Sequence, residues 1–307
     1  MASKLGKQES AGAVRKLSDL VAGSTENAAV RTRFLAQLFN TVGDSQVKYG
    51  ALLAALRYAA KAGTTGQLMP AWEGSLDSFM GSFGDVGPGA KRELYVAFAE
   101  QYAEPCAKSY KCLLQAVATL DKEPAAGAGA GELVAKAIVE FLKAKDVYSC
   151  DLLHGAAVKG MGKSSKHYGM VELLQIFVEG QFSDYEAFMG KNKGLLGAYG
   201  LDAEDCARKM RIMTLAGIAS TADAGEVSYA YVKEALGIEG DTVEKWIVSA
   251  IGAGVLEGRM DQMREVLEVS KTTARTFKAA DWEEVAKRLS MFKTNLNSIA
   301  ASIDVVA

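Results

Sequence analysis

Residues 206–274 carry expected elements in the order helix, helix, helix, strand, strand. Apolar residues recur at helical spacing in the first three segments, whereas residues 255–260 and 264–270 are strand-like runs joined by a polar turn. This order is that of the winged helix, so a winged-helix domain is predicted over residues 206–274. The core residues predicted for it are Met210, Ile212, Trp246, Ile247 and Ile251.

Local signals mark the ends of the second and third of these helices. Ser228 is expected to cap the second helix, and Gly237 is expected to end it in a left-handed conformation. Asp241 and Glu244 have the spacing of a capping box, which predicts the start of the third helix.

A fourth helix is predicted within residues 275–307, where Asp281 and Glu284 have the spacing of another capping box. Its apolar residues follow the 3-4-3-4 spacing of a coiled-coil seam. A seam this long is expected to be buried, so the end of the helix is predicted to dock on other chains. The seam residues are Trp282, Val285, Leu289, Phe292, Leu296, Ile299 and Ile303.

The residues before the winged helix have a helical period throughout. Residues 27–205 are therefore predicted to form a helical-repeat arm, an α-solenoid of helical hairpins, with a flexible linker near 121–131 and a flexible N-terminus over 1–26. The fold class expected for the whole chain is mainly α. The expected arm helices lie within 30–42, 49–60, 68–83, 94–102, 110–117, 133–142, 147–158, 170–178, 185–189 and 195–199.

Composition excludes several classes of protein. The 307 residues are 49% hydrophobic and 23% charged, which is typical of a soluble globular chain of about two domains. The start lacks the apolar run of a signal peptide, and no apolar stretch approaches the roughly 20 residues that span a bilayer, so an intracellular, cytoplasmic protein is expected. The four cysteines form no CxxC pair and are expected to be reduced core thiols.

The sequence offers little for catalysis, and no catalytic residue, metal or cofactor is expected. It has two histidines and neither an HExxH nor a GxSxG motif. Cys150, His154 and His167 could be imagined as metal ligands, but their spacing matches no common site, and solvated or core residues are the favoured interpretation. The glycines within 84–89 and 127–131 lack a preceding strand and are interpreted as linkers rather than phosphate loops.

Nucleic-acid-binding proteins are the other functional class to consider. The net charge is −2, the third winged-helix segment has only one cation, Lys245, and the hairpin mixes both signs. Two groups of basic residues are more often solvated faces, but they keep direct RNA contact open as a hypothesis. They are Lys159, Lys163, Lys166, Arg208, Lys209 and Arg211.

A helical arm that runs into a winged helix and then a single helix resembles the PCI-domain family. That family occurs in the proteasome lid, the cullin-deneddylating signalosome and eukaryotic translation initiation factor three, and the sequence is most similar to members from the initiation factor. The segments that carry the resemblance are 207–219, 226–228, 275–277 with Trp282, and 292–297.

The resemblance implies a non-catalytic scaffold subunit. PCI winged helices associate edge to edge in an arc, and their last helices gather in a shared bundle. The implied partners are the A subunit of the initiation factor within the arc, the F and H subunits near the bundle, and the small ribosomal subunit through the complex. The equivalent subunit of the signalosome or the proteasome lid is an alternative, and a winged-helix regulator that binds nucleic acid is a more distant one.

Overall fold

The computed structural model describes residues 7–72, 76–83, 86–121, 129–162, 165–222, 225–238, 242–275 and 279–304. Its elements fall into two compact units. The first unit comprises Met1–Val147, Leu152–Leu174 and Met189–Lys209. The second unit comprises Tyr148–Asp151, Gln175–Phe188 and Met210–Ala307.

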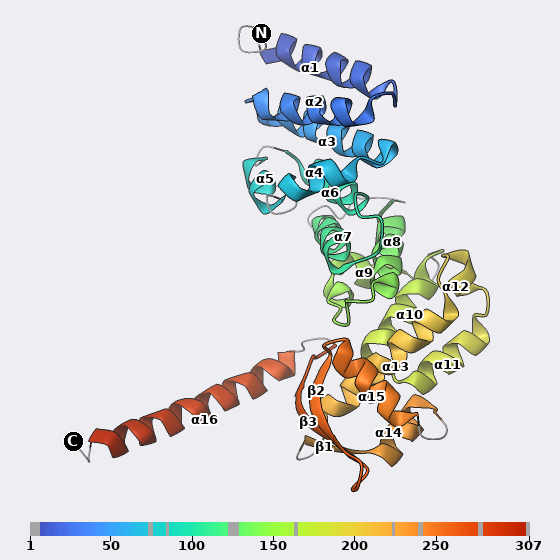
Figure 1. Ribbon diagram of the computed structural model, residues 1–307, viewed down its shortest axis with the longest axis vertical. Helices are drawn as coiled ribbons and strands as arrows, with labels where there is room; N and C mark the ends of the chain where they lie inside the picture. Colours follow the sequence, from blue (N-terminus) through green and yellow to red (C-terminus); the bar gives the residue numbers. More distant parts are fainter. Residues whose placement is uncertain are drawn as a thin grey trace. The chain divides into compact units, whose positions relative to one another are not determined.

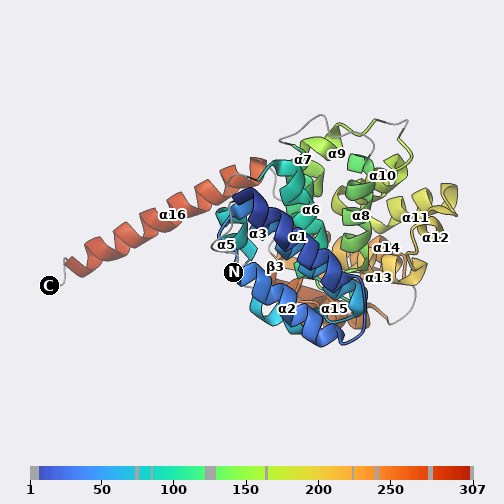
Figure 2. The ribbon, with the colours of Figure 1, turned by 90° about the horizontal axis from the view of Figure 1, so that it is seen from above.

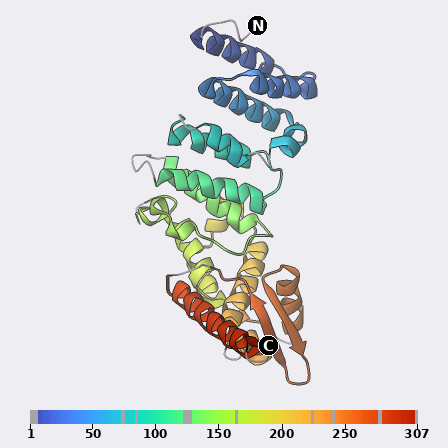
Figure 3. The ribbon, with the colours of Figure 1, turned by 90° about the vertical axis from the view of Figure 1, so that its left-hand side faces the viewer.

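The first unit is built from α-helices that pack on their neighbours in the sequence, as Figures 1 and 3 show. Its elements are α1 (Lys7–Ala22), α2 (Ala28–Thr41), α3 (Ser45–Ala62), α4 (Thr65–Trp72), α5 (Leu76–Ser82), α6 (Pro88–Ala99), α7 (Ala107–Leu120), α8 (Gly129–Lys143), the 3-10 helix η3 (Leu152–His154), α9 (Ala156–Lys159) and α12 (Leu195–Ala198). Three helices contribute residues to both units: α10 (Tyr168–Glu179), α11 (Phe182–Lys191) and α13 (Ala203–Ser220). The close pairs α2–α3, α6–α7 and α7–α8 confirm the predicted α-solenoid.

Helix α3 illustrates how the sequence sets these elements. The Asp44 carboxylate accepts hydrogen bonds from the backbone N–H groups of Gln46 and Val47, at 3.1 and 3.2 Å, which satisfies two donors of the first turn. Gly63 ends the helix with a φ of 66°, a left-handed conformation that glycine adopts without a steric penalty. Between these ends, α3 buries one apolar face that includes Leu56.

The prediction of a flexible N-terminus over residues 1–26 is wrong for residues 7–22, which form α1. This helix packs on α3 and buries Val14 and Ser18, which lie one turn apart. Among the side chains of α1 that the structure describes, these two buried positions make a stripe too narrow to stand out in the hydrophobic pattern, and one of them is a polar residue.

Two of the predicted arm helices differ from the structure. Residues 68–83 were expected as one helix but contribute to α4 and α5, and residues 73–75 lie outside the described part. Residues 147–158 were also expected as one helix, yet they contain only η3 and most of α9. Their buried residues include Cys150, whose backbone N–H donates to the carbonyl oxygen of Arg275 at 3.0 Å, a bond outside any helix.

The interpretation of the glycine stretches as linkers is wrong for the described glycines, which lie at the starts of two helices, and Gly84 and Gly127 lie outside the described residues. Gly87 is the N-cap of α6, with Pro88 in its first turn, where the missing N–H has no consequence. Gly129 and Gly131 lie in the first turn of α8. The predicted linker at 121–131 falls mainly on residues 122–128, which lie outside the described part.

The second unit contains the predicted winged helix (Figure 1). Its elements are the second part of α13, then β1 (Glu226–Ser228), α14 (Tyr229–Leu236), α15 (Val243–Gly252), β2 (Leu256–Asp261), β3 (Val266–Thr272) and α16 (Ala279–Asp304). The expected strands correspond to β2 and β3, shifted by one or two residues. Strand β1 was not predicted, because three residues are too few to show an alternating pattern.

The three strands form an antiparallel sheet in the order β1-β3-β2. Leu267 in β3 lies opposite Val227 on one side and Met260 on the other, and it is fully buried. The ladder between β2 and β3 is irregular at Gly258, where a Cβ atom would overlap the carbonyl oxygen of Glu268. A glycine is therefore required at this position.

The core of the winged helix joins its helices and all three strands. The core includes the apolar face of α13, the helix that corresponds to the first of the three predicted segments with helical apolar spacing. Its buried residues are Ile212, Leu215, Ala216, Ile218, Ala219, Val227, Tyr229, Val232, Leu236, Val243, Ile247, Ala250, Val255, Leu256 and Leu267.

The predicted ends of α14 are confirmed. The hydroxyl of Ser228 accepts a hydrogen bond from the N–H of Tyr231 at 3.4 Å, and Gly237 has a φ of 58°.

The two predicted capping boxes are wrong. Helix α15 begins at Val243, its N-cap is Thr242 without a side-chain cap, and Asp241 lies outside the described residues. The Glu244 carboxylate instead accepts from the amide of Gln262 at 2.8 Å. Helix α16 begins at Ala279, so Asp281 lies inside the helix rather than at its N-cap.

Candidate interaction surfaces

Helix α16 is a continuous helix of 26 residues, drawn without interruption in Figures 1 and 2. Most of the predicted seam is exposed along it. The exposed fractions are 65% for Trp282, 61% for Leu289, 61% for Phe292, 49% for Leu296 and 56% for Ile299. Val285 is half-buried, and the side chain of Ile303 lies outside the described residues. Five large apolar side chains on one helix form an apolar surface of the kind that marks an interaction site.

The predicted core residues of the winged helix take different places. Ile212 and Ile247 are buried in its core, and Trp246 and Ile251 are half-buried against it. Met210 is fully buried but lies outside that group of residues.

The surface of the winged helix has no basic face over its described residues. Arg264 pairs with Glu226 at 2.9 Å and lies 3.6 Å from Glu268, and Lys271 pairs with Glu257 at 2.9 Å. Lys245 is the only cation of α15. Arg264 and Lys271 are thus matched by carboxylates, and α15 contributes a single cation, so the described surface does not gather the several cations on one face that bind phosphates.

The residues predicted as possible RNA contacts do not form one surface group. Lys159, Lys166 and Arg208 are exposed, and Lys163 lies outside the described residues. Lys209 must be removed from the set. It is 6% exposed, and its ammonium donates to the carbonyl oxygens of Phe141 and, at 2.7 Å, Ala144.

Lys209 therefore has a structural role at the carboxyl end of α8. Carbonyls at this end of a helix have no partners within the helix, and a cation there is favoured by the helix dipole. The ammonium also lies 4.2 Å from the centre of the Phe141 ring, a cation–π distance.

Replacing Lys209 by methionine is expected to lower the free energy of unfolding by about 2 kcal/mol, because the carbonyls of Phe141 and Ala144 lose a charged donor. Urea denaturation measures the change. Arg208→Met is the matched control, one residue earlier and exposed, and should have little effect. Unchanged stability in Lys209→Met would contradict the buried placement.

Arg211 also contributes to packing. Its guanidinium carbon lies 4.2 Å from the ring centre of Phe182 and 5.2 Å from that of Trp246. Its Nε donates to the carbonyl oxygen of Leu236, the last residue of α14, at 3.2 Å. Arg211 thus joins α11, α13, α14 and α15 within the second unit and is only partly available to an external ligand.

A third cation with a structural role, the half-buried Arg275, was not identified as structural from the sequence. Its Nε donates to the carbonyl oxygen of Met213 at 2.5 Å, and its Nη1 donates to that of Gly180 at 2.6 Å. A Cβ atom at Gly217 would lie 2.7 Å from its Nη2, so a side chain at this position would displace the guanidinium. Burial lowers the pKa of Arg275 to about 10, so it is still protonated at neutral pH.

The imagined metal ligands are not brought together as a site. No group of three or more His, Cys, Asp or Glu residues with metal-binding geometry occurs in the described part of the chain. His167 Nδ1 lies 2.8 Å from the hydroxyl of Tyr199, His154 is exposed, and Cys150 is buried.

Burial raises the pKa of the Cys206 thiol to about 11, so this thiol is protonated at neutral pH.

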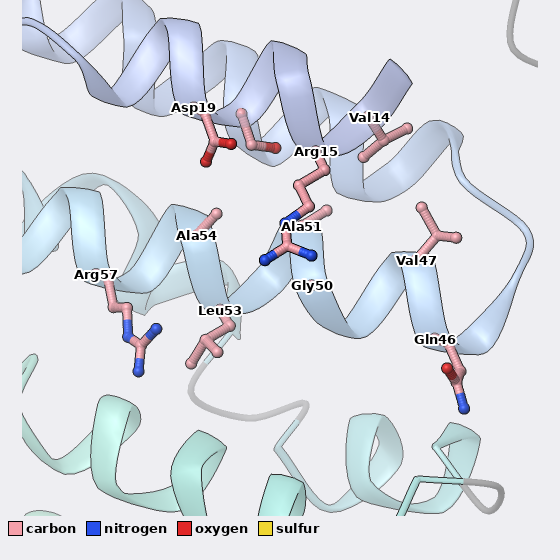
Figure 4. Close-up of a pocket in the computed structure, with 11 residues that line it drawn as sticks. Val14, Arg15, Asp19, Gln46, Val47, Gly50, Ala51, Leu53, Ala54 and Arg57 are labelled. Atoms are coloured by element: carbon pink, nitrogen blue, oxygen red, sulfur yellow. The ribbon is translucent and has the colours of Figure 1, made fainter. Parts of the chain in front are cut away.

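A pocket of about 410 Å³ lies between α1 and α3 in the first unit (Figure 4). Its charged lining residues are Arg15, Asp19 and Arg57, and Arg57 forms an ion pair with Glu93. The hydroxyl of Ser18 is buried there without a hydrogen-bond partner among the described residues. Among the described lining residues, Asp19 is the one carboxylate and lies beside two arginines.

None of the described helices is both long enough and apolar enough to cross a lipid bilayer.

Comparisons with known proteins agree with this architecture. Residues 189–271 match the family model of the PCI domain. Over 93% of this chain and 65% of the relative, the sequence is 28% identical to "Eukaryotic translation initiation factor 3 subunit M" from Phaeosphaeria nodorum. It is 29% identical to the protein of that name from Chaetomium globosum, over 86% of this chain and 63% of the relative, and 26% identical to the one from Dictyostelium discoideum, over 94% and 72%. The chain thus spans less than two thirds of the length of the first two.

Proposed function

We propose that this chain, which carries a PCI domain and is similar over most of its length to subunit M of eukaryotic translation initiation factor 3, is a non-catalytic scaffold subunit of that factor. The observation that carries the proposal is the exposed seam of α16, from Trp282 to Ile299. Burial of each such side chain contributes about 1.5 to 3 kcal/mol, so the seam favours assembly with other helices.

The proposed assembly uses two surfaces. The winged helix associates edge to edge with other PCI subunits, and the A subunit is the proposed neighbour in that arc. Helix α16 joins a helical bundle near the F and H subunits. Through the complex, the chain supports recruitment to the small ribosomal subunit in the cytoplasm. The family resemblance supports these partners, and the two exposed edge strands, β1 and β2, are compatible with the first contact.

Two other functions are less well supported. The equivalent subunit of the cullin-deneddylating signalosome or of the proteasome lid would have the same architecture, but the relatives named above are subunits of the initiation factor. A winged-helix regulator that binds nucleic acid would need a basic surface, whereas Arg264 and Lys271 are paired with carboxylates.

Native affinity purification of this chain from its own cells tests the proposal. Mass spectrometry should identify initiation-factor subunits, and small-subunit ribosomal RNA should be recovered with them. Cullin-processing or proteasomal partners would contradict the function but keep the fold. A chain recovered alone, or on DNA, would contradict both the scaffold role and the use of α16.

A further inference from the structure

The charges of α16 are distributed unevenly along the helix. Asp281, Glu283 and Glu284 lie near its amino end, where negative charge is favoured by the helix dipole. From Val285 to Ile303 the sequence has three cations and no acidic residue. The cations are Lys287, Arg288 and Lys293.

Two of these cations border the apolar seam. Counting the heptad from Trp282 as position a, Arg288 occupies position g just before Leu289, and Lys293 occupies position e just after Phe292. Both side chains are exposed. Lys287 is also exposed but occupies position f, the outermost position of the heptad. The middle of the seam is therefore bordered by positive charge on both sides.

We propose, on the basis of the proposed function, that the occupant of this seam is an α-helix from another subunit that carries Asp or Glu beside its own apolar seam. Side chains at positions e and g face those of the neighbouring helix, whether the two run parallel or antiparallel, and their charges decide which partner is accepted. Lys293 and Arg288 select an acidic partner and disfavour a basic one, including a second copy of α16 in the same register.

The composition of α16 favours a protein helix over other occupants. A nucleic acid would leave Leu289 and Phe292 unused, and three cations along 19 residues provide few phosphate contacts. An anionic membrane is bound by helices with a strongly basic polar face, whereas the polar face here is mostly uncharged. It includes Ser290, Thr294 and Asn297.

A matched pair of charge reversals tests this. Lys293→Glu and Lys287→Glu make the same change six residues apart on one helix, but only the first lies beside the seam. In the reconstituted complex, Lys293→Glu should raise the rate at which the chain dissociates about fivefold, since an attractive pair becomes repulsive. Lys287→Glu should leave that rate unchanged. If the two substitutions change the dissociation rate equally, or if neither changes it, the proposal of an acidic partner helix is wrong.

Zero-length carbodiimide crosslinking of the wild-type complex identifies the carboxylates. Lys293 should couple to an Asp or Glu of another subunit, next to an apolar residue at heptad spacing, and Lys287 should not. Coupling of Lys287 as strongly as Lys293 would overturn the proposal. In separate assays, crosslinking of α16 to RNA, or binding of α16 to phosphatidylserine vesicles instead of protein, would also overturn it.

A separate variant distinguishes failure of this inference from failure of the proposed function. If Leu289→Asp abolishes assembly while Lys293→Glu and Lys287→Glu behave alike, the acidic partner is wrong and the bundle remains. If Leu289→Asp assembles normally, both proposals are wrong.

Discussion

Replacement of Arg275 by methionine is expected to lower the free energy of unfolding by about 3 kcal/mol, because the buried carbonyls of Met213 and Gly180 lose a charged hydrogen-bond donor. Methionine fills part of the volume but donates nothing. Arg275→Lys should rescue little of the loss, since one ammonium cannot reproduce the fork of Nε and Nη1 that reaches α13 and the end of α10. Chemical denaturation of the purified chain measures both changes.

Arg264→Met is the control for this prediction. It removes an exposed arginine in the turn between β2 and β3, where the side chain pairs with Glu226 of β1. Surface pairs contribute little, so its denaturation midpoint should stay close to that of the wild type. Equal effects of Arg275→Met and Arg264→Met would mean that Arg275 is not buried as described. Gly217→Ala provides an independent check, because its Cβ would displace the same guanidinium and should reproduce part of the loss.

The features that the sequence predicts well depend on residues close together in the chain. Ser228 caps α14 through an N–H three residues away, and Gly237 ends this helix because glycine alone adopts the required φ without a steric penalty. The seam of α16 has a period that only a helix can place on one face. Such signals need no knowledge of the tertiary structure, and they predict the winged helix and α16.

The structural roles of Lys209, Arg211 and Arg275 could not be predicted in the same way. The acceptors of Arg275 lie 62 to 98 positions away, and those of Lys209 lie 65 and 68 positions away. A lysine that caps a distant helix has the same local sequence as a lysine in solvent. For this reason the basic residues of α13 were interpreted as one possible RNA-binding group, although Arg208 is exposed and Lys209 is buried.

The difference between the helix predicted over residues 147–158 and the short helices η3 and α9 has a related explanation. Residues 147–158 bury Val147, Cys150 and Val158, whose spacing fits one face of a helix, but the backbone at Cys150 bonds to Arg275 instead. Apolar spacing reports which residues are buried, not which backbone groups pair with each other. Where tertiary hydrogen bonds replace local ones, the helix predicted from spacing is lost.

Replacing Leu289 and Phe292 together by aspartate should leave the isolated chain folded and remove it from its complex. Both side chains are 61% exposed, so the charges remain in water and the melting temperature of the isolated chain should not change. In the bundle they would be buried. Loss of two apolar contacts and burial of two charges cost about 5 kcal/mol or more, which is on the order of several thousandfold in affinity.

A pull-down with the double variant measures this loss. Ser290→Asp combined with Asn297→Asp is the matched control, since it adds the same two charges at position b, away from the seam. The control should still assemble, because those side chains stay in solvent when the seam is covered. Assembly of the seam variant at the wild-type level would show that α16 does not hold the chain in its complex. Loss of assembly in both variants would indicate that added charge, rather than the apolar seam, disrupts the contact.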